Sequence, residues 1–131
     1  MNSAGTADRP GAVPVRVVFA DDHPMFRYGL RAVLASCADI VIAGEAATGR
    51  ELIGVVETTQ PDVVITDLHL PDLGGVAATR ELLGRWPDLA VLVLTMLDDD
   101  ESVFSAMRAG ARGYLLKGAG RTELVATVQA L

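Results

Sequence analysis

The feature that most constrains the fold of this chain is a regular alternation between short apolar segments and longer amphipathic ones. Such short runs are typical of strands that are buried on both faces of a parallel sheet. The stretches that follow each run carry apolar residues at helical spacing. The predicted strands are Val15–Ala20, Ile40–Glu45, Val63–Asp67, Ala90–Thr95 and Gly113–Lys117. Five strand–helix units predict a doubly wound α/β fold with right-handed crossovers.

Several residues mark where the predicted helices begin and end. Pro24 can open the first helix, because the first turn does not need the N–H that proline lacks. Thr48 and Glu51 have the spacing of a capping box at the start of the second helix. Pro87 ends the third helix, and Asp98 can cap the fourth. These signals agree with the boundaries that the apolar segments predict.

The length and charge of the chain limit its possible functions. Its 131 residues fit one domain, which we expect over residues 15–131 behind a flexible leader at residues 1–14. The predicted last helix stops at Leu131, an apolar residue without a cap, so we expect that helix to be truncated. The net charge of −6 argues against direct binding of a nucleic-acid backbone.

The sequence carries no signal for export or membrane insertion. A single cysteine, Cys37, cannot form an internal disulfide bond. No apolar run reaches the roughly 18 residues of a membrane span. The leader lacks a basic segment followed by an apolar one, so it is not a secretory signal. The expected location is the cytoplasm, without a membrane partner.

Polar residues follow four of the five predicted strands. Asp21 and Asp22 end the first, Asp67 the third, Thr95 the fourth and Lys117 the fifth. A single polar residue commonly ends a strand without any function. Four strands of a parallel sheet, however, deliver their carboxyl ends to one edge, which is where ligands bind in open α/β folds. The set therefore predicts a functional site at that edge.

The residue types at this edge indicate phosphoryl chemistry with a hard cation. Neighbouring carboxylates repel each other, so they either take up protons or hold a cation. Oxygen ligands suit Mg²⁺ better than zinc. A hydroxyl and an ammonium can bind the oxygens of a phosphoryl group, and an aspartate can be the nucleophile that receives it. Lys117 is the only lysine beside ten arginines, which favours a specific role for its compact charge.

Four segments of the chain resemble a bacterial response-regulator receiver domain. They are Val-Val-Phe-Ala-Asp-Asp-His-Pro at 17–24, the stretch from Asp62 to Gly75, Val-Leu-Thr-Met at 93–96, and Gly-Ala-Arg-Gly-Tyr-Leu-Leu-Lys at 110–117. The resemblance extends over about residues 15–131. The wording of the first and last segments is most similar to the NarL/FixJ subfamily, whose receivers precede a LuxR-type helix-turn-helix domain. The resemblance implies a flavodoxin-like sheet with strand order 2-1-3-4-5.

The resemblance also implies roles for individual residues. Asp67 is then the phosphorylated aspartate. Asp22, Asp67 and the backbone carbonyl of His69 would bind Mg²⁺ or Mn²⁺ directly, and Asp21 would act through water. Thr95 and Lys117 would bind the phosphoryl group.

Three further side chains acquire expected roles from the same resemblance. Tyr114 would turn inward when Thr95 moves in the active state. His69 and Leu97 would flank the phosphorylation site and tune the lifetime of the phosphoryl group. His23 is expected at the surface, where it opens the first helix.

The implied partners follow from the same family. A sensor histidine kinase or a small acyl phosphate would donate the phosphoryl group. The chain would assist its own phosphorylation without being a turnover enzyme. Phosphorylation would change dimerisation through the first and fifth helices, or through the face of the fourth helix, fifth strand and fifth helix. DNA would be bound only by a C-terminal domain that is expected in the parent protein and absent from this chain.

Two other classes of protein share this architecture. An aspartyl-phosphate phosphatase or phosphotransferase commonly has a second aspartate two residues after the nucleophile, where this chain has His69. A flavodoxin-like flavin protein needs a Ser/Thr/Gly-rich phosphate loop after the first strand. This chain has Asp21-Asp22-His23-Pro24 in that place, which repels phosphate unless a cation intervenes.

Overall fold

A five-stranded parallel sheet forms the centre of the molecule. The computed structural model describes residues 13–96 and 99–131. The strands are β1 (Val15–Ala20), β2 (Ile40–Ala46), β3 (Val63–Asp67), β4 (Ala90–Thr95) and β5 (Gly113–Leu116). Their order is β2-β1-β3-β4-β5, and every neighbouring pair is parallel. The predicted doubly wound sheet with strand order 2-1-3-4-5 is confirmed. Most of the predicted leader, together with Leu97 and Asp98, lies outside the described residues.

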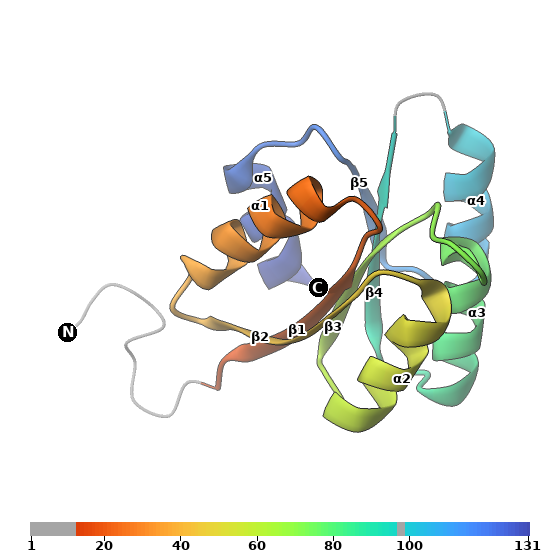
Figure 1. The fold of residues 1–131 in the computed structure, drawn as a ribbon, viewed down its shortest axis with the longest axis horizontal. Coiled ribbons are helices and arrows are strands. Elements are labelled where there is room, and N and C mark those ends of the chain that lie inside the picture. The colour runs from red at the N-terminus through yellow and green to blue at the C-terminus, as the bar shows by residue number, and fades with distance from the viewer. Residues whose placement is uncertain (1–12, 97–98) are drawn as a thin grey trace.

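Five helices cover the two faces of the sheet. They are α1 (Pro24–Ala35), α2 (Gly49–Thr59), α3 (Gly75–Arg85), α4 (Asp100–Arg108) and α5 (Arg121–Ala130). Figure 1 shows α1 and α5 on one face and α2, α3 and α4 on the other. Among the described residues, no helix has both the length and the apolar character needed to cross a bilayer.

The apolar strand residues are divided between two hydrophobic clusters, one on each face. In β1, Val17 and Phe19 point into the cluster beneath α1 and α5, while Val18 and Ala20 point into the other. All four side chains are fully buried. Every residue of β3 and β4 is buried as well. Because helices cover both faces of the sheet, neither face of these strands contacts solvent. This explains why their apolar runs are continuous.

The predicted helix starts are largely confirmed. Pro24 stands at the start of α1. Thr48 Oγ1 accepts a hydrogen bond from the backbone N–H of Glu51 at 3.1 Å. The carboxylate of Glu51 in turn accepts one from the backbone N–H of Ala47 at 2.6 Å. The N-cap residue of α4 is Asp99, so the prediction of Asp98 at this position is wrong by one residue.

Two strand ends differ from the sequence prediction by one residue each. β2 extends to Ala46, where it still pairs with Ala20. β5 ends at Leu116, so Lys117 lies in the turn that follows it. The backbone N–H of Lys117 nevertheless donates to the carbonyl of Thr95 at 2.9 Å. The lysine therefore remains held against the end of β4.

An ion pair between α1 and β2 makes the stability of the fold depend on pH. Arg31 donates a hydrogen bond to Glu45 at 2.7 Å and contacts its second carboxylate oxygen through Nε. The hydrogen bond from Arg31 lowers the pKa of Glu45, against the opposing effect of burial. A carboxyl whose folded pKa is lowered stabilises the fold above its unfolded pKa of about 4.3, and this stability is lost as the pH falls.

Glu45→Gln is accordingly expected to lower the free energy of unfolding at neutral pH. The side chain of Arg31 is 43% exposed, so screening limits the expected loss to about 0.5–1 kcal/mol. Urea unfolding of both proteins should show this difference near neutral pH and a smaller one in acid. Glu57→Gln is the matched control and should have a smaller effect. Glu57 is 62% exposed, and its carboxylate lies 3.4 Å from Arg85, which makes a weaker ion pair. A loss that is constant across the pH range would contradict this account.

Candidate functional site

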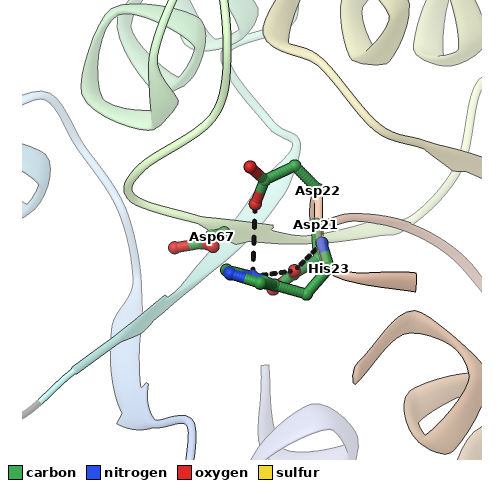
Figure 2. A group of neighbouring side chains, drawn as sticks. All are labelled: Asp21, Asp22, His23 and Asp67. Atoms are coloured by element: carbon green, nitrogen blue, oxygen red, sulfur yellow. Dashed lines mark hydrogen bonds and ion pairs between the residues drawn. The ribbon is translucent and has the colours of Figure 1, made fainter. Parts of the chain in front are cut away.

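Three aspartates meet at the carboxyl edge of the sheet. Asp21 and Asp22 follow β1, and Asp67 is the last residue of β3, which is the neighbour of β1. One ligand atom from each of them, together with one from His23, lie within 4.8 Å of each other. Figure 2 shows these four side chains, which we call the acidic cluster. Asp21 and Asp67 are buried, whereas Asp22 is partly open to solvent.

Lys117, in the turn after β5, reaches the acidic cluster at the same edge of the sheet. Its Nζ lies 2.8 Å from Oδ2 of Asp21 and donates to Oδ2 of Asp67 at 3.2 Å. The ammonium also lies 4.5 Å from the ring centroid of Phe26. Burial alone would lower the pKa of Lys117, but its contacts with Asp21 and Asp67 raise it above the ordinary value. The lysine therefore stays charged beside the two buried carboxylates.

Asp67 is held in place by both of its carboxylate oxygens. Oδ1 accepts a hydrogen bond from the backbone N–H of His69 at 3.0 Å, and Oδ2 accepts the one from Lys117. Burial raises the pKa of Asp67 above its ordinary value, while the hydrogen bonds from His69 and Lys117 act in the opposite direction. This carboxylate is positioned at the end of a buried strand and has a cation at one oxygen.

The charges and donor atoms of the cluster fit a divalent cation. Three carboxylates and one ammonium leave two negative charges, which one divalent ion would neutralise. Oδ2 of Asp21 is buried and accepts no hydrogen bond from the described residues, although the ammonium of Lys117 is near it. Mg²⁺ and similar hard ions prefer oxygen ligands, such as the carboxylate oxygens of this cluster. The residues present therefore suit the predicted metal.

The two remaining predicted residues lie beside the cluster and not within it. Thr95 ends β4, is buried, and donates through Oγ1 to the carbonyl of Met96 at 3.1 Å. Tyr114 in β5 is 52% exposed and points outward. Thr95 and Tyr114 line a groove of about 380 Å³, which the side chains of Phe104 and Met107 also border.

His23 lies at the surface at the start of α1, as expected, but the directions of both histidine rings were not predicted. His23 is the N-cap residue of α1 and is largely exposed, but its ring is turned toward the cluster and lies 3.0 Å from Oδ1 of Asp21. The ring of His69 leaves the cluster and contacts the carboxylate of Asp99 at the start of α4. This hydrogen bond lowers the pKa of Asp99. Leu97, the second predicted lifetime residue, lies outside the described residues.

Sequence reasoning missed three contributors to the site. They are the ring of His23, the carboxylate of Asp99, and Arg27, which donates to the backbone carbonyl of Asp21 at 2.7 Å. The position of His23 next to two aspartates was a usable signal. The partnership of His69 with Asp99 spans 30 residues and has no local sequence pattern.

Comparison with known proteins identifies the family. Residues 17–129 match the response regulator receiver domain. The transcriptional regulatory protein YhcZ of Bacillus subtilis is 44% identical over 115 residues, which are 88% of this chain and 54% of that protein. The chain spans about half the length of the curated relatives it matches.

Two solved structures support the same assignment. The signal receiver domain of the response regulator NarL from Mycobacterium tuberculosis superposes with a TM-score of 0.86 and 32% identity, covering 90% of this chain and 95% of that one. A LuxR-family response regulator from an Aurantimonas species gives a TM-score of 0.84 at 33% identity, with 89% and 84% coverage. With the acidic cluster, the strand order and these matches together, the chain belongs to the response regulator receiver domain family and is a receiver domain of the NarL/LuxR type.

Proposed function

We propose that this domain receives a phosphoryl group on Asp67. The observation that supports this most directly is the placement of Asp67, which is buried at the end of β3 with Lys117 Nζ at 3.2 Å from its Oδ2. A carboxylate oxygen of Asp67 attacks the phosphorus atom of the donor. The bond from phosphorus to the donor's leaving atom breaks, the leaving group takes the electron pair, and an acyl phosphate remains on Asp67.

The metal ligands in this proposal are Asp22, Asp67 and the backbone carbonyl of His69, with Asp21 acting through water. Mg²⁺ is the proposed ion and Mn²⁺ its substitute. When bound, the ion supplies positive charge that offsets the repulsion between the carboxylates and the phosphoryl oxygens. Lys117 contributes a second positive charge beside Oδ2 of Asp67.

Thr95, Lys117 and Tyr114 are the proposed switch residues. The hydroxyl of Thr95 now donates to a backbone carbonyl, and in the phosphorylated state it turns to the phosphoryl oxygens instead. Tyr114 then moves from its exposed position into the groove beside Thr95, which has room for it. The result is a shift of α4 and β5 between two packings.

The proposed partners extend beyond the chain. A sensor histidine kinase, or a small acyl phosphate, supplies the phosphoryl group in the cytoplasm. The output is a change in homodimerisation through α1 and α5 or through α4, β5 and α5, and DNA binding by a further domain of the parent protein. The domain promotes its own phosphorylation and releases no metabolite, so it acts as a switch and not as a turnover enzyme.

Intact-mass measurement tests this proposal directly. The purified domain is incubated with acetyl phosphate, with and without Mg²⁺, and its mass is followed over time. We expect a gain of one phosphoryl group that requires Mg²⁺. Continuous hydrolysis of acetyl phosphate over many turnovers would instead favour the phosphatase or phosphotransferase hypothesis, and a coloured protein with bound flavin would favour the flavodoxin-like one.

The contact between His69 and Asp99 is expected to control the lifetime of the phosphoryl group. It joins the loop after Asp67 to the start of α4. In this proposal the ring, held there by Asp99, limits the access of water to Asp67. His69→Ala removes this cover and should let water reach the acyl phosphate more easily, which shortens its lifetime severalfold. The measurement is the rate at which the phosphorylated mass disappears after excess donor is removed.

Two aspartate variants test whether the position of the His69 ring matters as well as its presence. Asp99→Asn weakens the contact while His69 stays, so it should shorten the lifetime in the same direction. Asp100→Asn, at the neighbouring exposed position, is the matched control and should have no effect. A lifetime in His69→Ala equal to that of the wild type would show that this contact does not protect the phosphoryl group.

A further inference from the structure

The ring of His23 takes part in the acidic cluster. Its Nδ1 lies 3.0 Å from Oδ1 of Asp21 and 3.2 Å from Oδ1 of Asp22. Figure 2 shows the ring folded back toward these carboxylates. The backbone supports this arrangement, because the N–H of His23 donates to the same oxygen of Asp21 at 2.8 Å. The residue is thus bound to Asp21 by both its main chain and its ring.

The spacing of these atoms matches the ligand shell of one small ion. Adjacent ligands of an octahedral ion with bonds of about 2.1 Å lie about 3.0 Å apart, and opposite ligands about 4.2 Å apart. Nδ1 of His23 lies at 3.0 and 3.2 Å from two carboxylate oxygens, which are distances of adjacent ligands. The whole set spans no more than 4.8 Å, slightly more than one such shell. Nδ1 of His23 and the carboxylates of Asp22 and Asp67 are therefore close enough to bind one ion directly, while Asp21 acts through water.

Lys117 lies next to the same ring nitrogen. Its Nζ lies 3.3 Å from Nδ1 of His23. An ammonium can only donate, so a hydrogen bond from Lys117 needs the lone pair of Nδ1, whereas hydrogen bonds to the carboxylates need a proton on that atom. Metal binding uses the tautomer with the lone pair on Nδ1, in which the ion takes the place of that proton between the ring and the carboxylates.

We propose that Nδ1 of His23 is a direct ligand of the ion in this site. The site therefore binds transition ions that prefer imidazole, such as Ni²⁺ and Zn²⁺, more tightly than its carboxylates alone would bind them. Imidazole nitrogen suits these ions, whereas carboxylate, carbonyl and water oxygens alone suit Mg²⁺ and Mn²⁺. This inference rests on the metal site of the proposed function and adds to it a nitrogen ligand that changes its selectivity.

Metal titration of matched variants tests the inference without any measurement of phosphorylation. Isothermal titration calorimetry gives the dissociation constants of Mg²⁺ and Ni²⁺ for the wild type and for His23→Gln. An all-oxygen site also binds Ni²⁺ better than Mg²⁺. The decisive quantity is therefore how much the substitution weakens each ion. We expect His23→Gln to weaken Ni²⁺ binding by about ten-fold or more and Mg²⁺ binding by less than about two-fold.

An exposed carboxylate supplies the control for unspecific binding. Asp88→Asn changes a surface residue that lies before β4 and is not a member of the acidic cluster. It should leave the Ni²⁺ affinity unchanged. Equal weakening by Asp88→Asn, or an unchanged Ni²⁺ affinity in His23→Gln, would overturn the proposal. Tighter Mg²⁺ binding in His23→Gln with no loss for Ni²⁺ would also overturn it, since the ring would then obstruct the site.

A spectroscopic measurement on the wild type does not depend on the variants folding. The ¹⁵N resonance of Nδ1 of His23 should shift strongly when Zn²⁺ is added, while the ring nitrogens of His69 should not. An unshifted Nδ1 resonance with Zn²⁺ bound would contradict direct ligation. A wild type that binds no Mg²⁺ would instead contradict the metal site of the proposed function, so the two failures are distinguishable.

Discussion

Asp67→Asn is expected to abolish the gain of a phosphoryl group from acetyl phosphate. The substitution keeps the volume of the side chain, so the buried end of β3 has the same shape to pack around. It replaces the carboxylate nucleophile with an amide, which is a much weaker nucleophile, and so removes one of the two carboxylates that Lys117 contacts. Intact mass after incubation with acetyl phosphate and Mg²⁺ measures the effect, and we expect no phosphorylated species.

Asp72→Asn is the matched control for this experiment. Asp72 lies in the same loop after β3, is exposed, and is not a member of the acidic cluster. Its backbone has a φ of 62°, a conformation that asparagine also tolerates. This variant should gain the phosphoryl group as the wild type does. Full labelling of Asp67→Asn would place the acceptor on another residue and refute the assignment.

Gly75→Ala is expected to destabilise the protein strongly. A Cβ atom at Gly75 would lie 2.1 Å from the backbone carbonyl oxygen of Asp67 and 2.6 Å from Cα of Leu68. The N–H of Gly75 also donates to the carbonyl of Leu68 at 2.9 Å, which fixes the close approach. Because the obstacle is backbone, rotation of a side chain cannot relieve it. We expect a loss of about 3 kcal/mol in the free energy of unfolding.

The same substitution at the other end of α3 should have the opposite sign. Gly84 is exposed, and a Cβ atom there would have no neighbour within 4 Å apart from its own stretch of the helix. Gly84→Ala should stabilise the protein by about 0.5–1 kcal/mol, because alanine favours the helix. Urea unfolding of both variants measures the contrast. A Gly75→Ala variant within about 0.5 kcal/mol of the wild type would show that the start of α3 can move away from β3 at little cost.

Much of the fold follows from the sequence because the central strands are buried on both faces. That burial leaves an uninterrupted apolar run, so the ends of β1, β3 and β4 were predicted to the residue. The ends of β2 and β5, at Ala46 and Leu116, were wrong by one residue. These are the edge strands of the sheet, where burial is incomplete and the apolar pattern is weaker.

The sequence predicted which residues reach the site, but it did not predict which way every side chain points. Asp67 ends β3 and Lys117 directly follows β5, so their convergence follows from the places of these strands in the sheet. The ring of His23 could turn toward solvent or toward the aspartates from the same N-cap position, and the sequence does not decide between them. The outward direction of Tyr114 likewise depends on the packing of α4 beside it, which no local pattern encodes.

The single lysine makes this site selectively observable by chemistry. Lys117 is the only side-chain amine of the chain, and it contacts both Asp21 and Asp67. Methylation of a lysine preserves its charge. A ¹³C-methyl label introduced there would give one side-chain NMR signal from the centre of the cluster. That one resonance would report metal binding and phosphorylation without any assignment of the rest of the spectrum.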